Sequence, residues 1–328
     1  MKIITFRVRE VEAPIFEKIN NKFGYELTYY SEGLSKENIH LVKGFDCLIV
    51  RANDTLDSSL LKTIWDYGVR YLLTRTVATN HIDLNAAHEL GFMMARVPSY
   101  SPTAIAELAF SLAHMLSRKS LHFAEKGRNK NFVVDPFGFS KELKNSTIGV
   151  VSVGKIGLAA AKMFKAFSPN VLGYDPYPSN EAKEVVDFVS LDELLKRSDI
   201  ISVHTPYING VNEKMIGKDF ISKMKDGAIL VNTSRGQIQD EKEILNALKS
   251  GKLSAVATDV LNEEGKYFFK ELKKYEDPVI EELMSLYPRF VLTPHVGSYT
   301  DEAALNMIET SYENLKEYIE TKNCKNKI

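Results

Sequence analysis

The chain has 328 residues, 44% of them hydrophobic and 26% charged, and a formal net charge of −1. That length usually holds two domains, and a nearly neutral chain has no overall field that would attract nucleic acid or an anionic membrane. Two cysteines are too few for a disulfide framework or a thiolate metal site. No apolar run reaches the ~18 residues of a membrane span, and the strand-like first residues lack a signal peptide. We therefore expect a cytoplasmic protein whose partners include neither nucleic acid nor membrane.

Residues 1–99 alternate short apolar runs with helical stretches, which is typical of an α/β domain with a largely parallel sheet. Two loops of this region, 51–54 and 74–80, follow apolar runs, and open α/β sheets bind ligands at the carboxyl ends of their strands. Arg51 is the first charge after one such run. Position alone leaves two interpretations open, because Arg51 could pair with Asp54 at the surface or bind an anionic ligand.

A helix is predicted from Pro102 to about Ser117, since Ser101 can cap it and proline suits its first position. Its apolar stripe is typical of a core or a subunit interface, and we interpret this helix as a bridge between domains. A last helix is predicted after Thr300. No sheet partner remains near it in sequence, so we expect it to pack back on the first domain.

Residues 146–176 follow the plan of a dinucleotide site: a strand, a tight turn, a helix, a second strand and an acidic residue. Backbone N–H groups at the helix start can face a pyrophosphate, and Asp175 follows the turn at close to the roughly 20 residues expected for the ribose-binding carboxylate. Ser152 replaces the first glycine of G-x-G-x-x-G, and serine adopts a positive φ less readily than glycine. The cofactor-binding residues predicted here are Val153, Gly154, Lys155, Ile156, Gly157 and Asp175.

Three side chains beyond this region can carry the chemistry of a 2-oxo acid. Arg235 can bind a carboxylate through two parallel hydrogen bonds, and His295 is a natural proton donor near neutral pH. Glu264 could orient His295, although Glu263 and Glu264 fit a solvated acidic turn equally well. With a nicotinamide, this set predicts a reduction in which Arg235 holds the carboxylate and His295 protonates the carbonyl oxygen. No metal is expected, because the seven histidines show no ligand spacing.

Four motifs in order make the chain similar, over almost its full length, to the D-isomer-specific 2-hydroxyacid dehydrogenases. They are Val150–Gly157, Val231–Gly236, Asp259–Glu264 and Thr293–Tyr299. The resemblance implies NAD as the cofactor and two flavodoxin- or Rossmann-like α/β domains with mostly parallel sheets, with cofactor and substrate in the cleft between them. It implies a discontinuous substrate-binding domain, 1–99 plus 299–328, a dinucleotide-binding domain, 100–298, and a homodimer.

The resemblance also implies roles for single residues. Arg235 anchors the substrate carboxylate, and Glu264 and His295 form the proton-handling pair. The further cofactor contacts predicted are His204, Pro206, Thr233 and Asp259. The substrate contacts predicted besides Arg235 are Arg51, Val77, Ala78, Tyr100 and Tyr299. Ala78 stands where the family usually has glycine.

Within the family, the chain most resembles NAD-dependent (R)-2-hydroxyglutarate dehydrogenases, through Arg51 and the stretches 132–141 and 286–302. This predicts interconversion of 2-oxoglutarate and (R)-2-hydroxyglutarate. The alternative is a D-lactate, aromatic or branched-chain (R)-2-hydroxyacid dehydrogenase. A more distant alternative is an NAD(H)-sensing corepressor. Since the chain begins at its first predicted strand and ends soon after its last predicted helix, without the tails of such relatives, we expect an enzyme.

Overall fold

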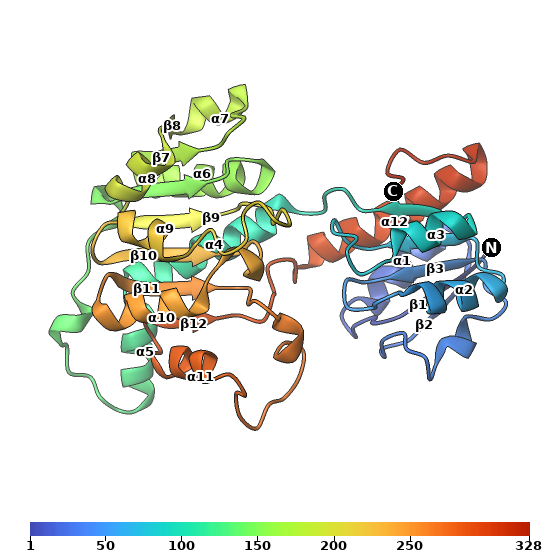
Figure 1. Cartoon of the computed structure of the whole chain (residues 1–328), viewed down its shortest axis with the longest axis horizontal. Helices are drawn as coiled ribbons and strands as arrows, with labels where there is room; N and C mark the ends of the chain where they lie inside the picture. The colour runs from blue at the N-terminus through green and yellow to red at the C-terminus, as the bar shows by residue number, and fades with distance from the viewer. The chain divides into compact units, whose positions relative to one another are not determined.

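The computed structural model describes all 328 residues, and the chain divides into two compact α/β units. Unit 1 contains Met1–Ser101 and Tyr299–Ile328, and unit 2 contains Pro102–Ser298. Each unit is built on one sheet in which all neighbouring strands are parallel (Figure 1). The predicted fold class, two α/β domains with mostly parallel sheets, is confirmed.

Unit 1 has a five-stranded sheet in the order β2-β1-β3-β4-β5. Its strands are β1 (Lys2–Thr5), β2 (Glu26–Tyr29), β3 (Cys47–Val50), β4 (Tyr71–Thr74) and β5 (Met93–Arg96). Its helices are α1 (Ala13–Phe23), the short 3₁₀ helix η1 (Ile39–Val42), α2 (Ser58–Asp66), α3 (Leu84–Leu90) and α12 (Asp301–Thr321). The central strand β3 is buried along its whole length, as expected for a continuous apolar run in a parallel sheet.

Helices cover both faces of this sheet. On one face, α1 and α12 bury Phe16, Ile308 and Tyr312 against the strands, and on the other α2 and α3 bury Leu61 and Ala87. Figure 1 shows the red C-terminal helix among the blue N-terminal elements of unit 1. Burying a large apolar side chain contributes about 1.5–3 kcal/mol, so core packing holds α12 to the N-terminal part of the chain.

Unit 2 has a seven-stranded sheet in the order β12-β11-β10-β9-β6-β7-β8. Its strands are β6 (Thr147–Val151), β7 (Asn170–Tyr174), β8 (Asp187–Phe188), β9 (Ile200–Val203), β10 (Ala228–Asn232), β11 (Leu253–Thr258) and β12 (Phe290–Leu292). Its α-helices are α4 (Pro102–Ser117), α5 (Ser120–Arg128), α6 (Lys155–Phe167), α7 (Asn180–Val185), α8 (Leu191–Arg197), α9 (Lys218–Lys223), α10 (Glu241–Ser250) and α11 (Pro278–Ser285). Four 3₁₀ helices complete it: η2 (Pro136–Gly138), η3 (Leu143–Asn145), η4 (Gly236–Ile238) and η5 (Glu264–Lys266).

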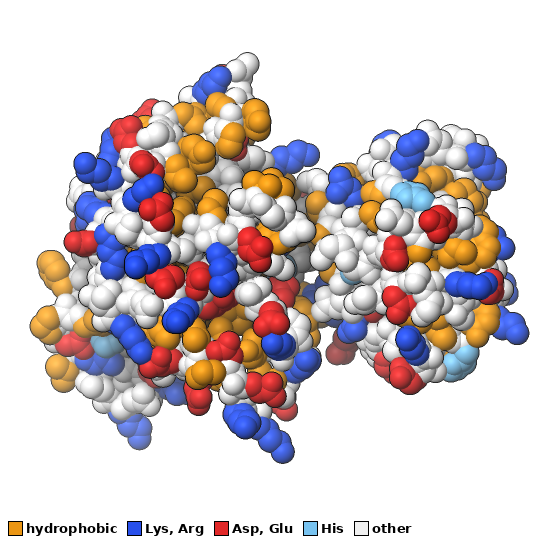
Figure 2. All heavy atoms as spheres, in the orientation of Figure 1, with side chains coloured by type: hydrophobic (Ala, Val, Ile, Leu, Met, Phe, Trp, Pro, Cys, Tyr) orange, Lys and Arg blue, Asp and Glu red, His pale blue; other side chains and the backbone are white.

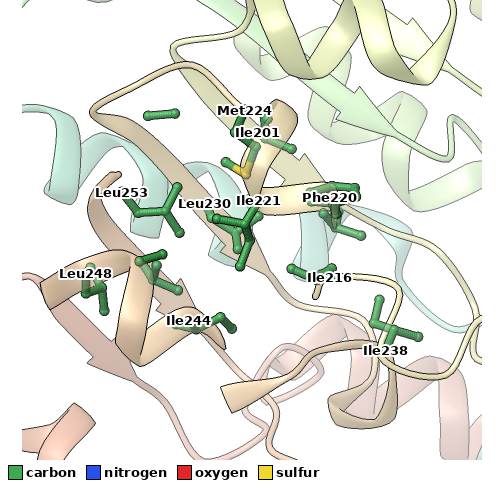
Figure 3. Close-up of a cluster of buried hydrophobic side chains, with 14 of the residues drawn as sticks. Ile201, Ile216, Phe220, Ile221, Met224, Leu230, Ile238, Ile244, Leu248 and Leu253 are labelled. Atoms are coloured by element: carbon green, nitrogen blue, oxygen red, sulfur yellow. The ribbon is translucent and has the colours of Figure 1, made fainter. Parts of the chain in front are cut away.

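Two apolar layers enclose the sheet of unit 2. Figure 3 shows the layer formed by α9 and α10, in which Phe220, Ile221 and Ile244 meet strand residues such as Ile201 and Leu230. The opposite layer is formed by α4 and α6. The strand order reverses at β6, which lies between β7 and β9. Open α/β sheets bind ligands beyond the carboxyl ends of the strands at such a point.

The helix that we interpreted as a bridge between domains lies wholly in unit 2. α4 packs on α6 and on the strands β9 to β11, and it buries Ala106, Ala109 and Leu112 there. Its apolar stripe therefore belongs to the core of one unit. The division of the chain falls after Ser101 and before Tyr299, whereas the sequence placed its first boundary after residue 99.

Candidate active site

The turn after β6 has the shape that a pyrophosphate requires. A Cβ added to Gly157 would lie 2.0 Å from the carbonyl oxygen of Ser152, so only glycine fits there. Gly154 precedes helix α6 and provides no side-chain cap, which leaves the first N–H groups of the helix free for an anion. Its first residues, Lys155 and Ile156, present those groups.

Ser152 adopts a φ of +69°, in the left-handed region that favours glycine. Its hydroxyl lies 2.8 Å from Oγ1 of Thr205, which follows β9. The turn therefore keeps the left-handed backbone conformation that glycine would adopt there, and the backbone of Ser152 is strained as a result. The hydroxyl pair links the two strands between which the sheet order reverses.

Asp175 follows β7 and lies at the same turn. One carboxylate oxygen accepts the N–H of Val153 at 2.9 Å, and the other accepts the N–H of Tyr177 at 2.8 Å. These bonds fix the carboxylate beside the start of α6, where it can accept hydrogen bonds from ribose hydroxyls. An uncapped helix start and an oriented carboxylate fit a dinucleotide.

Two buried polar atoms near the carboxyl ends of β9 and β10 have no partner in the protein, Nδ1 of His204 and Oγ1 of Thr233. Nε2 of His204 lies 2.9 Å from the hydroxyl of Ser202, and burial lowers the pKa of His204 to about 4. The ring is therefore neutral at pH 7. Nearby, the carbonyl of Pro206 accepts from Asn212 at 2.7 Å. Buried polar atoms normally have partners, so both orphaned atoms are suited to a bound ligand.

His295 and Glu264 form a hydrogen-bonded pair. Nδ1 of His295 lies 2.9 Å from Oε1 of Glu264, and each side chain is 35% exposed. Glu263 points elsewhere, to Lys266 at 2.8 Å. A carboxylate beside Nδ1 fixes the tautomer and leaves Nε2, which has no protein partner, as the atom that exchanges protons. The structure thus separates the two glutamates that the sequence left equivalent.

Asp259 builds the loop that carries His295. Its carboxylate accepts from Thr293 Oγ1 at 2.5 Å and from the N–H groups of Val296 and Gly297 at 2.9 and 2.8 Å. Its backbone carbonyl accepts the N–H of His295, whose φ is +53°. Burial raises the pKa of Asp259, although these hydrogen bonds act in the opposite direction and lower it. Strained backbone of this kind clusters at functional sites, and here it orients the imidazole.

Arg235 follows β10 in a tightly packed turn. A Cβ on Gly236 would lie 1.9 Å from the carbonyl oxygen of Leu261, so this segment touches the one that leads to Glu264. Nη1 of Arg235 donates to the carbonyl of Ser234 at 2.7 Å. No protein carboxylate pairs with this guanidinium, which leaves its charge available to an anionic ligand.

In unit 1, the loop after β4 presents backbone N–H groups. The carbonyls of Val77 and Ala78 accept from Arg96 at 2.9 Å and from Thr76 Oγ1 at 2.6 Å, while the N–H groups of Val77 and Ala78 donate to no protein acceptor. Ala78 does not have a positive φ, so alanine fits this position without strain. The loop is suited to bind a carboxylate.

Arg51 pairs with a different residue from the one considered above. Its Nη1 lies 3.4 Å from Oε1 of Glu12, whereas Asp54 accepts its backbone N–H and pairs with Arg7 at 2.7 Å. The alternative that the Arg51 side chain pairs with Asp54 is therefore wrong. Burial lowers the pKa of Arg51 to about 10, and the neighbouring Arg75 adds to this effect.

Glu12 and Arg75 are functional candidates that sequence reasoning missed. Nη1 of Arg75, a side chain only 1% exposed, lies 3.6 Å from the other oxygen of Glu12. That oxygen also accepts the N–H of Arg9, and the guanidinium of Arg9 lies 4.4 Å from the ring centre of Tyr299. We call this group the arginine cluster, which consists of four cations and two carboxylates: Arg7, Arg9, Arg51, Arg75, Glu12 and Asp54.

The remaining predicted substrate contact, Tyr100, accepts a hydrogen bond from Asn306 at its carbonyl, at 2.7 Å. No group of three or more His, Cys, Asp or Glu side chains is arranged to hold a metal ion. None of the helices has the length and apolar character needed to cross a membrane. Figure 2 shows positive and negative side chains interspersed over the visible face.

The chain is similar to known proteins over almost its whole length. Residues 110–297 match the family model described as D-isomer specific 2-hydroxyacid dehydrogenase, NAD binding domain. An aromatic 2-oxoacid reductase of Clostridium sporogenes is 37% identical and covers 99% of this chain and 98% of its own length. A D-lactate dehydrogenase of Lactiplantibacillus plantarum is 36% identical and covers 98% of this chain and 97% of its own length. The crystal structure of a D-lactate dehydrogenase from Treponema pallidum has a TM-score of 0.92 at 34% identity, and the match covers 100% of this chain and 99% of the other.

Proposed function

The chain belongs to the family of D-isomer-specific 2-hydroxyacid dehydrogenases, and we propose that its substrates are 2-oxoglutarate and (R)-2-hydroxyglutarate. It is an NAD-dependent oxidoreductase that interconverts a 2-oxo acid and its (R)-2-hydroxy acid. The observation that carries the substrate proposal is the excess of cations over carboxylates in the arginine cluster.

Glu12 is shared between two guanidiniums, those of Arg51 and Arg75, at 3.4 and 3.6 Å. Each therefore has only part of one carboxylate, and the side chain of Arg51 is 18% exposed. A half-buried cation with an incomplete partner favours a further anion. The distal carboxylate of 2-oxoglutarate supplies that charge, whereas the methyl of pyruvate or the ring of phenylpyruvate does not.

The residues of the chain then take these roles. Arg235 and the N–H groups of Val77 and Ala78 bind the C1 carboxylate. Protonated His295 donates from Nε2 to the carbonyl oxygen of the 2-oxo acid, and Glu264 stabilises the charged ring through Nδ1. In the opposite direction neutral His295 removes the proton of the hydroxyl group. A positioned acid–base group of this kind contributes about 10²- to 10⁴-fold to a rate.

NADH, when bound, supplies the hydride to the carbonyl carbon. The first N–H groups of α6, from Gly154 to Gly157, would hold its pyrophosphate, and Asp175 would accept from its ribose hydroxyls. The orphaned atoms of His204 and Thr233 are suited to the same ligand. Asp259 orients the loop of His295.

A second candidate is favoured by the relatives. The reductase of Clostridium sporogenes is named for aromatic 2-oxo acids, and the dehydrogenase of Lactiplantibacillus plantarum is named for D-lactate. Neither is named for a diacid. If this chain shares their substrates, Arg51 serves only as an internal partner of Glu12.

One experiment separates the two candidates. Steady-state kinetics with NADH should be measured for 2-oxoglutarate, pyruvate, phenylpyruvate and 2-oxoisocaproate. A kcat/KM highest for 2-oxoglutarate supports the diacid. A higher value for pyruvate, phenylpyruvate or 2-oxoisocaproate rejects it in favour of the second candidate.

We also propose a homodimer and a cytoplasmic location. The segment 132–139 exposes several large apolar side chains, among them Phe132 at 83% and Phe139 at 91%, and exposed apolar segments mark interaction surfaces. Both cysteines are free, which suits a reducing compartment. Sedimentation equilibrium of the purified chain tests the dimer.

A further inference from the structure

Three consecutive carbonyl groups in the loop after β4 accept hydrogen bonds within unit 1. The carbonyl of Thr76 accepts the N–H of Val97 at 3.2 Å. The carbonyl of Val77 accepts from Nη1 of Arg96 at 2.9 Å, and the carbonyl of Ala78 accepts from the hydroxyl of Thr76 at 2.6 Å. Each of these three peptide groups is therefore held in one orientation.

The fixed carbonyls also set the directions of three N–H groups. A trans peptide group is planar, so its N–H points away from its C=O. The N–H groups concerned belong to Val77, Ala78 and Thr79, which are half-buried, and none of them donates to an acceptor in the protein. Successive backbone N–H groups in a turn are suited to bind an anion. The loop thus presents three directed donors, of which the one on Thr79 was not predicted from the sequence.

A chain of hydrogen bonds fixes the hydroxyl of Thr76. Oγ1 of Thr74 lies 2.7 Å from Oγ1 of Thr76 and 3.0 Å from Nε2 of His81. The hydroxyl of Thr76 gives its only proton to the carbonyl of Ala78, so it accepts the proton of the Thr74 hydroxyl. Thr74 then has only a lone pair to offer His81, and the ring must carry its proton on Nε2.

The other end of this chain lies in the core of unit 1. Thr74 is the last residue of β4, and both its side chain and that of His81 are buried. Burial lowers the pKa of His81 to about 4, so the ring is neutral at pH 7. Its Nδ1 has no partner in the protein, which agrees with a proton on Nε2. The buried groups therefore set the direction in which the hydroxyl of Thr76 points.

We propose that Thr76 is a positioning residue for the substrate. Its hydroxyl holds the carbonyl of Ala78 and so directs the N–H of Thr79. That N–H and those of Val77 and Ala78 bind the C1 carboxylate of the 2-oxo acid, and Arg96 has the same positioning role at the carbonyl of Val77. The inference rests on the carboxylate-binding role proposed above for this loop.

The C1 carboxylate is the part of the substrate that all 2-oxo acids share, whereas the arginine cluster concerns the distal group. The panel of four acids described above can therefore reject 2-oxoglutarate without affecting the role of Thr76. Conversely, Thr76 can prove to have no effect whichever acid is preferred. The two proposals thus fail in different experiments.

Replacing Thr76 by valine tests the proposal, because it removes the hydroxyl without changing any charge. The kcat/KM with NADH should be measured for the acid that ranks first in the panel and for its C1 methyl ester. We expect Thr76→Val to lower the value for the acid roughly tenfold to a hundredfold, since a small misplacement of a binding group can cost about 10²-fold. The value for the ester should change less than about threefold, because the ester lacks the charge-assisted bonds to the N–H groups.

Two further variants serve as controls. Thr76→Ser keeps the hydroxyl and should recover most of the kcat/KM of the parent for the acid. Thr63→Val in α2 removes a hydroxyl that donates to the carbonyl of Ser59 at 3.0 Å, and it should leave the values for acid and ester like those of the parent. NADH binding, measured by fluorescence titration, should be the same in the parent and in all variants.

Two outcomes overturn the positioning role. Equal losses for the acid and the ester in Thr76→Val would show a general disturbance of the fold, and an unchanged kcat/KM for the acid would show that the hydroxyl does not act on the substrate. If thermal denaturation shows that Thr76→Val does not fold, Thr76→Ala, which has a smaller side chain, is compared with Thr76→Ser in the same way.

Discussion

Nδ1 of His295 lies 2.9 Å from Oε1 of Glu264, and the loop of the histidine is pinned by the buried carboxylate of Asp259. The imidazole is therefore oriented from two sides, while its Nε2 has no protein partner. This arrangement assigns the proton transfer to Nε2. Experiments can distinguish the two acidic residues, because Glu264 acts on the charge of the ring and Asp259 on the position of its backbone.

Replacing His295 by alanine should lower kcat by roughly 10²- to 10⁴-fold, which is the usual contribution of a positioned acid–base group. Binding of NADH, measured by fluorescence titration, should change less than about threefold, since no observed contact links His295 to the turn after β6. Parent-like turnover in this variant would move the proton donor to another residue.

Replacing Glu264 by glutamine keeps a hydrogen-bond acceptor near Nδ1 and removes the negative charge. The carboxylate stabilises the positive charge that the ring carries when it donates its proton, so kcat/KM for reduction of the 2-oxo acid should fall below that of the parent. Steady-state kinetics with NADH measure this loss, and a parent-like kcat/KM would mean that Glu264 has no electrostatic role. Glu263→Gln is the matched control, because Glu263 pairs with Lys266 instead.

Replacing Ser152 by glycine should relieve a positive φ that costs about 1–2 kcal/mol for a residue with a Cβ. The change also removes the hydroxyl contact with Thr205 at 2.8 Å, worth about 1 kcal/mol, so the free energy of unfolding should rise slightly or stay equal. NADH should bind as tightly as in the parent or more tightly. Chemical denaturation and NADH titration measure the two effects, and a variant that fails to fold would contradict this account of the turn.

Cofactor preference should follow Asp175. Its carboxylate accepts the N–H of Val153 and lies where the 2′-phosphate of NADP would bring further negative charge. We expect kcat/KM to be at least tenfold higher with NADH than with NADPH, and the difference should shrink in Asp175→Asn. Equal values for the two cofactors in the parent would show that the carboxylate does not face the ribose.

The sequence revealed the buried strands more readily than the edge strands. β3 and β4 are fully buried and appear as continuous apolar runs. The strands β2 and β8 lie at the edges of their sheets with half-exposed side chains, and neither was predicted. An edge strand packs on fewer neighbours, so its composition carries less of the strand signal.

Site residues that stand within a recognisable sequence motif could be predicted. Contacts between residues that are distant in sequence, and that only the fold brings together, could not. His295 and Arg235 stand in recognisable motifs, and their geometry agrees with the roles we propose. The contacts of Glu12 with Arg51 and Arg75 depend on the strand order β1-β3-β4, which brings the chain after three separate strands to one edge of the sheet. Sequence spacing alone does not specify that order.

The role of Arg51 gives the decisive prediction for the substrate. Removing one partner of a buried charge pair costs ~2–5 kcal/mol, so Arg51→Gln should lower kcat/KM for 2-oxoglutarate by roughly 30-fold or more, at about 1.4 kcal/mol per decade. Activity on pyruvate and phenylpyruvate should hold or rise, because these substrates have no distal charge to lose.

Arg51 also contacts Glu12, so the variant needs a control for structure. Glu12 keeps Arg75 at 3.6 Å and the N–H of Arg9, and we therefore expect only a modest loss of stability by thermal denaturation. Arg51→Lys retains the charge without the planar fork and should recover part of the activity on 2-oxoglutarate. A loss of similar size for every 2-oxo acid would assign Arg51 a structural role with Glu12. An unchanged rate on 2-oxoglutarate would reject the diacid in favour of an aromatic or lactate substrate.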